Sequence, residues 1–149
     1  MRKFSFACIA GLVGLLLSSV SFGDTPVDPL VQPADAVVLP SGVAYKVLKP
    51  GTGTEHPALT DTITVNYSLW DATEKPLEST VKADSSSDPA TFPLGKLIPG
   101  WREAIPLMVA GEKIRLWLPA EMAYGVHPTR PGKPAGALIF EIELIAIQH

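Results

Sequence analysis

Residues 62–69 read TITVNYSL, a strict alternation of polar and apolar side chains. Successive side chains of a β-strand point to opposite faces of its sheet, so this alternation predicts a strand with one buried face. An aromatic ring on that face lies in the same layer as the aliphatic core. The apolar face consists of Ile63, Val65, Tyr67 and Leu69.

Other strand-like stretches lie on both sides of this one. Pro and Gly, with 15 and 12 occurrences, supply frequent turns between them. Short strands separated by turns predict an antiparallel sheet. The predicted strands are 43–49 (VAYKVLK), 76–79 (PLES), 90–94 (ATFPL), 113–118 (KIRLWL) and 138–147 (LIFEIELIAI).

One short helix is expected at residues 99–108 (PGWREAIPLM). Trp101, Ile105 and Met108 fall on one helical face, which is suited to cover the apolar side of a sheet. Pro106 removes a backbone donor and crowds the preceding turn, so we expect the last turn to be distorted. An antiparallel sheet wrapped around one helix is an α+β domain.

The first 23 residues are typical of a secretory signal peptide. A basic start, Arg2-Lys3, precedes an apolar run over residues 4–20, and small residues at Ser21 and Gly23 predict cleavage after Gly23. An uncleaved membrane anchor is the alternative interpretation. It is disfavoured because the apolar run is short for a span of about 20 residues, and no stop-transfer charges follow it.

Residues 24–40 (DTPVDPLVQPADAVVLP) contain four prolines among small and acidic residues. This composition predicts an extended tether between the signal peptide and the domain. We therefore expect the folded domain to occupy residues 41–149.

Composition excludes several classes of function. Cys8 is the only cysteine and lies in the predicted signal peptide, so the mature chain would have no disulfide and no cysteine ligand for zinc. Without Arg2 and Lys3, 10 of the 12 basic residues remain against 15 acidic ones, a net charge of −5. No basic stripe is left to bind nucleic acid or an anionic membrane.

No familiar catalytic constellation is present either. The sequence contains no Gly-rich phosphate loop and no nucleophile-elbow serine. The three histidines have no ligand-like spacing, so we expect neither a metal nor a cofactor. They are His56, His127 and His149.

With these motifs absent, the remaining candidates for a functional site are aromatic and aliphatic residues at strand ends and in loops. Such residues usually belong to the hydrophobic core alone. Two positions favour a pocket instead. Trp101 follows Pro99-Gly100 at the helix entry, and Tyr124 lies in a loop, MAYG, where a structural aromatic is less expected. The complete set is Tyr67, Leu77, Ile98, Trp101, Tyr124 and Phe140.

Several motifs at compatible spacing resemble the FKBP family of prolyl isomerases. Together they cover nearly all of the predicted domain, and their agreement in order is more specific than any one alone. They are 65–67 (VNY), 94–101 (LGKLIPGW), Leu107-Met108 with Gly111-Glu112-Lys113, 119–125 (PAEMAYG) and 138–144 (LIFEIEL).

The resemblance implies a role for each matching position. Trp101 would form the floor of a proline pocket and Tyr124 would offer its hydroxyl to a substrate carbonyl. Tyr67 and Phe140 would form the walls, and the rim would consist of Leu97 and Ile98.

The sequence departs from the family pattern at two places. Leu77-Glu78 stands where the family usually has Phe-Asp, so Leu77 would keep an apolar wall and Glu78 an acidic group. An aromatic wall residue common in the family falls near Ala90, where no aromatic stands. The loop 126–136 does not align with the family, so no role is transferred to His127.

The resemblance implies an exported peptidyl-prolyl cis/trans isomerase, periplasmic or secreted, that acts on proline-containing polypeptides. A dry aromatic pocket could assist rotation without acid, base, nucleophile or cofactor. We expect a monomer with no stable membrane insertion after cleavage. The alternatives are a non-catalytic FKBP-like chaperone or peptide-binding module, and a purely structural exported domain.

Overall fold

The computed structural model describes residues 32–149. The predicted signal peptide and residues 24–31 of the predicted tether lie outside the described residues. Within 32–149, no helix has the length and apolar character needed to cross a membrane. The same part of the chain contains no group of three or more His, Cys, Asp or Glu side chains arranged to hold a metal ion.

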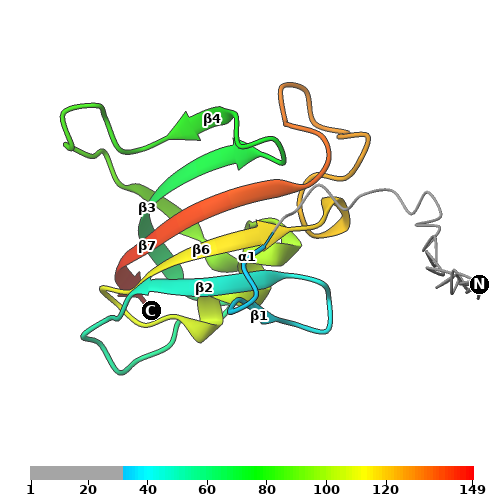
Figure 1. Ribbon diagram of the computed structural model, residues 1–149. Coiled ribbons are helices and arrows are strands. Elements are labelled where there is room, and N and C mark those ends of the chain that lie inside the picture. Colours follow the sequence, from blue (N-terminus) through cyan, green and yellow to red (C-terminus); the bar gives the residue numbers. More distant parts are fainter. Residues whose placement is uncertain (1–31) are drawn as a thin grey trace, which may run out of the picture.

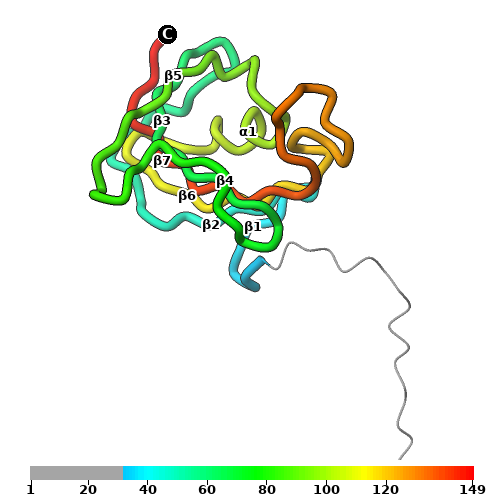
Figure 2. Tube along the Cα trace, turned by 90° about the horizontal axis from the view of Figure 1, so that it is seen from above, coloured from blue at the N-terminus to red at the C-terminus, as the bar shows by residue number. Residues whose placement is uncertain are grey.

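An antiparallel sheet curves around one short helix, α1 (Pro99–Ala104), as Figure 1 shows. Figure 2 shows α1 inside the curve of the sheet. The strand order is β1-β2-β6-β7-β3-β4, and β5 pairs with β3 off this path. The predicted α+β fold is confirmed. The strands are β1 (Val37–Val38), β2 (Ala44–Lys49), β3 (Thr62–Asp71), β4 (Pro76–Ser79), β5 (Ala90–Pro93), β6 (Lys113–Leu118) and β7 (Leu138–Gln148).

The sheet begins earlier than the sequence predicted. Val37 pairs with Tyr45 and Val38 with Ala44, so β1 lies within the residues assigned to the tether. This corrects the predicted domain start at Ser41. Two adjacent β-branched residues suffice for a short edge strand, although prolines dominate their surroundings.

The helix also differs in length from the prediction. α1 spans Pro99–Ala104, and a 3-10 turn, η2, continues it over Ile105–Leu107. The change from α-helix to 3-10 helix begins at Ile105, directly before Pro106, and confirms the expected distortion. The spacing of the apolar side chains is also confirmed, because the buried members of this segment include Trp101, Ile105 and Met108.

The main core lies between α1 and the concave face of the sheet. β3, β6 and β7 supply it with alternate side chains, as their sequences predicted. Burying each aliphatic side chain contributes about 1.5–3 kcal/mol, so these strands and α1 are firmly held together. The strand residues buried in this main core are Ile63, Val65, Leu69, Ile114, Leu116, Leu118, Leu138, Phe140, Ile142 and Leu144.

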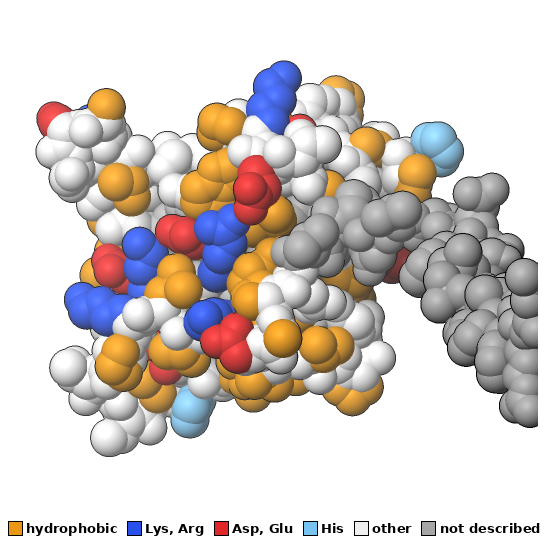
Figure 3. Space-filling model, in the orientation of Figure 1, with side chains coloured by type: hydrophobic (Ala, Val, Ile, Leu, Met, Phe, Trp, Pro, Cys, Tyr) orange, Lys and Arg blue, Asp and Glu red, His pale blue; other side chains and the backbone are white. Residues whose placement is uncertain are grey.

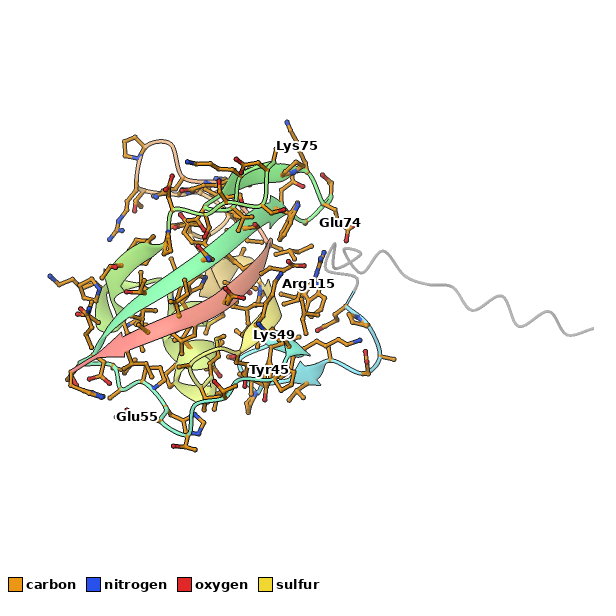
Figure 4. All side chains as sticks on the ribbon, turned by 90° about the vertical axis from the view of Figure 1, so that its left-hand side faces the viewer. Tyr45, Lys49, Glu55, Glu74, Lys75 and Arg115 are labelled. Carbon is orange, nitrogen blue, oxygen red and sulfur yellow. The ribbon has the colours of Figure 1, made fainter. Side chains whose placement is uncertain are left out.

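The convex face of the sheet carries a separate cluster around Arg115. Its guanidinium carbon lies 5.3 Å from the ring centroid of Trp70 and 5.7 Å from that of Trp117. Its nitrogens lie 3.2 Å from carboxylates of Glu141 and Glu74, and Figure 4 shows Arg115 and Glu74 approaching each other. Figure 3 shows this face as a mixture of apolar and charged groups of both signs.

The end of β7 is fastened to the rest of the domain through His149. Its Nδ1 lies 3.0 Å from Oδ1 of Asp61 and its Nε2 lies 2.7 Å from Oε1 of Glu55. Asp61 is buried and also accepts the backbone N–H of Ala58 at 2.8 Å. The carboxylates of Asp61 and Glu55 raise the pKa of His149, and the Ala58 N–H followed by His149 lowers the pKa of Asp61.

We expect His149→Gln to lower the free energy of unfolding most between the ordinary pKa values of Asp61 and His149, 3.8 and 6.5. The stabilisation from His149 is complete below 6.5 and is lost as pH rises through its raised pKa. The stabilisation from Asp61 is lost as pH falls below 3.8. Urea unfolding at several pH values checks this, with His127→Gln in an exposed loop as control. If His149→Gln lowers the free energy of unfolding by the same amount from about pH 5 to about pH 9, the proposed contribution of the His149–Asp61 pair is contradicted.

Candidate functional site

A cavity of about 360 Å³ opens beside the N-terminal end of α1. Residues from β3, β4, β5, α1, β7 and two loops line it, so segments far apart in the sequence meet here. Most of the lining side chains are apolar, with cations and one carboxylate among them. They are Tyr67, Leu69, Glu78, Phe92, Lys96, Leu97, Ile98, Trp101, Tyr124, Arg130, Lys133 and Phe140.

Trp101 lies at the centre of an aromatic cluster in this cavity. Its ring centroid is 5.2 Å from that of Phe140, 5.4 Å from that of Tyr67 and 6.1 Å from that of Phe92. The three interplanar angles lie between 80° and 81°, which is the edge-to-face geometry that aromatic pairs prefer. Trp101 and Phe140 are buried, so the cluster presents a rigid apolar wall.

The local sequence explains how Trp101 reaches this position. Pro99 stands in the first turn of α1, where its missing N–H costs nothing. Gly100 follows, and a Cβ at this glycine would collide with Leu118 of β6. The absence of a side chain at Gly100 therefore lets α1 approach the sheet closely, and the next residue, Trp101, is directed into the cavity.

The hydroxyl of Tyr67 donates a hydrogen bond of 2.6 Å to Oε1 of Glu78. Burial is the main cause that raises the pKa of Tyr67, and the hydrogen bond and negative charge of Glu78 raise it further. Tyr67 consequently stays protonated across the physiological range. The pair fixes the position of one wall and leaves the Glu78 carboxylate as the acidic group of the lining.

Tyr124 lies at the rim of the cavity and is half-buried. The backbone of Gly125 donates to the carbonyl of Ala120 at 2.9 Å, which closes the turn that carries Tyr124. The ammonium of Lys133 lies 5.3 Å from the Tyr124 ring centroid, in a cation–π contact. No hydrogen bond among residues 32–149 involves the Tyr124 hydroxyl.

The structure brings together seven of the eight predicted site residues and leaves out Leu77. Leu69 stands opposite Glu78 in the β3–β4 ladder, so Glu78 points to the concave face. The register shifts between the pairs Leu69–Glu78 and Trp70–Pro76, so Leu77 lies at an irregularity of β4 without a partner in β3. It is 42% exposed and lines a separate shallow hollow with Trp70, so the prediction that Leu77 lines the pocket is wrong. The seven are Tyr67, Glu78, Leu97, Ile98, Trp101, Tyr124 and Phe140.

Sequence reasoning missed Phe92 as part of the site. The family resemblance places an aromatic wall residue near Ala90, but the ring is supplied two positions further along β5. Ala90 and Phe92 share one face of the strand because side chains alternate. The alternation in residues 90–93 was the signal that could have identified Phe92.

The loop cations of the lining were missed as well. Arg130 and Lys133 come from the loop 126–136, for which alignment with a known family gave no roles, and Lys96 comes from a 3-10 turn, η1 (Leu94–Lys96). No periodic signal marks such positions. His127 is exposed and does not line this cavity.

The comparisons with known proteins agree with this geometry. A family model described as FKBP-type peptidyl-prolyl cis-trans isomerase matches residues 53–145. The Legionella longbeachae "Outer membrane protein MIP" is 45% identical over 117 residues, which are 75% of this chain and 47% of the relative. An Aeromonas hydrophila "FKBP-type peptidyl-prolyl cis-trans isomerase FkpA" is 42% identical over 113 residues, 72% of this chain and 39% of the relative.

Solved structures show the same fold. FkpA from Escherichia coli superposes with a TM-score of 0.69 at 30% identity, covering 78% of this chain and 53% of that one. A peptidyl-prolyl cis-trans isomerase from Pseudomonas syringae superposes with a TM-score of 0.67 at 30% identity, covering 78% and 84%. The chain spans about half the length of the curated relatives it matches.

Proposed function

Because this chain belongs to the FKBP-type peptidyl-prolyl cis-trans isomerase family, we propose that it catalyses rotation about the bond before proline in other polypeptides. The observation that supports this most directly is the cavity around Trp101, where three further aromatic rings surround a space of about 360 Å³. A proline ring is small, apolar and rigid, and it suits such a cavity.

The barrier to rotation is about 18–20 kcal/mol, and it reflects the lost resonance between carbonyl and nitrogen. The planar amide has the larger charge separation and is stabilised by water. A dry apolar cavity removes that stabilisation from the planar form more than from the twisted one. Each 1.36 kcal/mol gained in this way accelerates rotation about tenfold.

Individual residues divide this task. Trp101 would hold the pyrrolidine ring, with Tyr67 and Phe140 as walls and Leu97 and Ile98 at the rim. Glu78 would keep the Tyr67 ring in place through their hydrogen bond. The Tyr124 hydroxyl would donate to a substrate carbonyl. No proton is transferred and no covalent intermediate forms, so the chemistry requires neither metal nor cofactor.

We further propose that the chain is exported and acts as a monomer on unfolded client polypeptides. The basic and apolar start of the sequence supports export. Uncatalysed rotation takes tens to hundreds of seconds, which is slow enough to limit folding of exported proteins. The net charge of −3 gives the chain no general attraction to nucleic acid.

Tyr124→Phe is expected to slow isomerisation roughly two- to tenfold, which corresponds to one neutral hydrogen bond of about 0.5–1.5 kcal/mol. The fold should be unaffected, because no hydrogen bond to this hydroxyl occurs among residues 32–149. The measurement is cis-to-trans exchange of short Leu-Pro and Phe-Pro peptides, with Tyr45→Phe on β2 as control. An unchanged rate would remove the proposed role of Tyr124. Binding of these peptides by the unmodified chain without faster exchange would favour a peptide-binding module instead.

A further inference from the structure

Three cations surround the mouth of the aromatic cavity. Lys96, Arg130 and Lys133 all line it, although its floor and walls are apolar. Figure 2 shows the orange loop that carries Arg130 and Lys133 next to the yellow-green segment that leads into α1. Residues of both the loop and this segment line a second, adjacent cavity, which shows that the two lie side by side.

The three rim cations differ from most other basic side chains of the described domain. The ion pairs within residues 32–149 engage Lys46, Lys82, Lys113 and Arg115 with carboxylates. Lys96, Arg130 and Lys133 take part in none of these pairs, and all three are exposed. The single carboxylate of the cavity lining, Glu78, already accepts the Tyr67 hydroxyl. The rim therefore carries an excess of positive charge on a chain whose net charge is −3.

The second cavity places this charge where a residue next to proline would lie. It measures about 230 Å³ and shares Leu97, Ile98 and Tyr124 with the aromatic cavity. Lys96 and Arg130 line both cavities. A polypeptide with its proline ring against Trp101 would therefore extend over this shared wall, and the adjoining side chain would approach Lys96 and Arg130.

We propose that this rim selects polypeptides in which an Asp or Glu stands directly beside the proline. This preference rests on the function proposed above and names the substrate class of the same site. Charge complementarity supports it, because unpaired cations converge on a cavity that otherwise favours apolar groups. The net negative charge of the chain repels acidic peptides at long range, so the rim must produce any preference for them.

The test compares rates within matched peptides. Cis-to-trans exchange is measured for peptides with Glu, Gln or Lys directly before proline, and for a second series with the same residues directly after it. We expect kcat/KM for Glu to exceed that for Gln by roughly three- to tenfold in at least one series, as for two or three exposed ion pairs. We expect kcat/KM for the Lys peptides to be lower than for the Gln peptides. The ratio should decrease with added salt, because screening at about 0.15 M acts over about 8 Å.

The triple variant K96Q/R130Q/K133Q should bring the Glu-to-Gln ratio close to 1. Because both peptides are measured with the same variant, a general change in its activity does not affect the Glu-to-Gln ratio. A matched variant, K49Q/K75Q/R102Q, removes the same charge from positions that line neither cavity. Lys49 ends β2 and Lys75 lies in the β3–β4 turn (Figure 4). This variant should retain the ratio of the unmodified chain.

A ratio of 1 or less in both series, or a preference that survives K96Q/R130Q/K133Q, would overturn the proposed selectivity. If neutral Leu-Pro peptides are still accelerated, the proposed function stands while the selectivity falls. If no peptide is accelerated, the proposed function fails, and calorimetric binding of the Glu-Pro and Gln-Pro peptides then decides the selectivity. Equal affinities would overturn it, and tighter binding of the acidic peptide that is lost in the triple variant would support it.

Discussion

Trp101→Ala is expected to lower the free energy of unfolding by about 3–5 kcal/mol and to abolish isomerisation. Trp101 is 4% exposed and contacts three other rings, so its removal leaves a large void between α1 and the sheet. Domains of this size have a free energy of unfolding of only about 5–15 kcal/mol, so this substitution would remove a large part of the stability. Urea unfolding and peptide exchange measure the two effects.

Trp101→Phe separates the loss of function from the loss of fold. The indole Nε1 has no hydrogen-bond partner within residues 32–149, so phenylalanine loses ring area without breaking a bond there. We expect the variant to fold and its exchange rate to fall about tenfold. This corresponds to a loss of 1.36 kcal/mol in stabilisation of the twisted transition state. Trp117→Phe is the matched control, because Trp117 lies on the convex face beside Arg115. Equal loss of activity in both variants would contradict the proposed role of Trp101 as the floor of the site.

Gly100→Ala is expected to destabilise the domain by about 1–3 kcal/mol, although alanine normally favours a helix over glycine by about 0.5–1 kcal/mol. The added Cβ would meet the side chain of Leu118, with Cδ1 at 2.7 Å and Cγ at 3.0 Å. Leu118 is fully buried, so in a close-packed core its side chain can give way only by displacing its neighbours. Overpacking therefore outweighs helix propensity, and activity should fall because Trp101 is displaced with α1.

A double-mutant cycle checks this explanation. Leu118→Ala alone should cost about 2–5 kcal/mol through the cavity it opens. The combination G100A/L118A should cost less than the sum of the two changes, since the new methyl group enters the vacated space. Strictly additive costs would show that Gly100 and Leu118 do not press against each other. Unfolding by urea, with circular dichroism as the signal, gives all four free energies.

The sequence predicts the framework of this fold well because its strands are half-buried. Alternation in β3 and β7 identifies the buried faces and places Tyr67 and Phe140 on the concave side. The position of Pro106 predicts where the helix changes character. These features depend on local periodicity and local backbone chemistry, which are determined by residues close together in the sequence.

Features that depend on tertiary contacts could not be predicted in this way. β1 is a strand only because Val37 and Val38 pair with β2. Leu77 was placed in the pocket by analogy, but the register of β4 gives the inward position to Glu78. Register arises from pairing between strands, so neither residue alone reveals it.

The aromatic lining of the cavity follows from the sequence, whereas its cations do not. Trp101 and Tyr124 stand out as aromatic residues in unusual sequence positions. Arg130 and Lys133 belong to a loop without periodicity, and only the folded chain brings them to the cavity beside Lys96. Phe92 is predictable from the alternation of β5, which places it on the same face as Ala90.

We propose that rotation of the prolyl bond is catalysed in the cavity around Trp101. Exchange NMR on a Leu-Pro peptide titrated with the purified chain tests it most directly, because the peptide's exchange rate and the Trp101 indole signal are recorded in one sample. We predict an exchange rate that rises with enzyme concentration, and a Trp101 shift that saturates at the same peptide concentration as the rate. A folded chain that leaves the exchange rate at its uncatalysed value would rule out catalysis, and one that accelerates exchange while the Trp101 signal stays unchanged would rule out this cavity as the site.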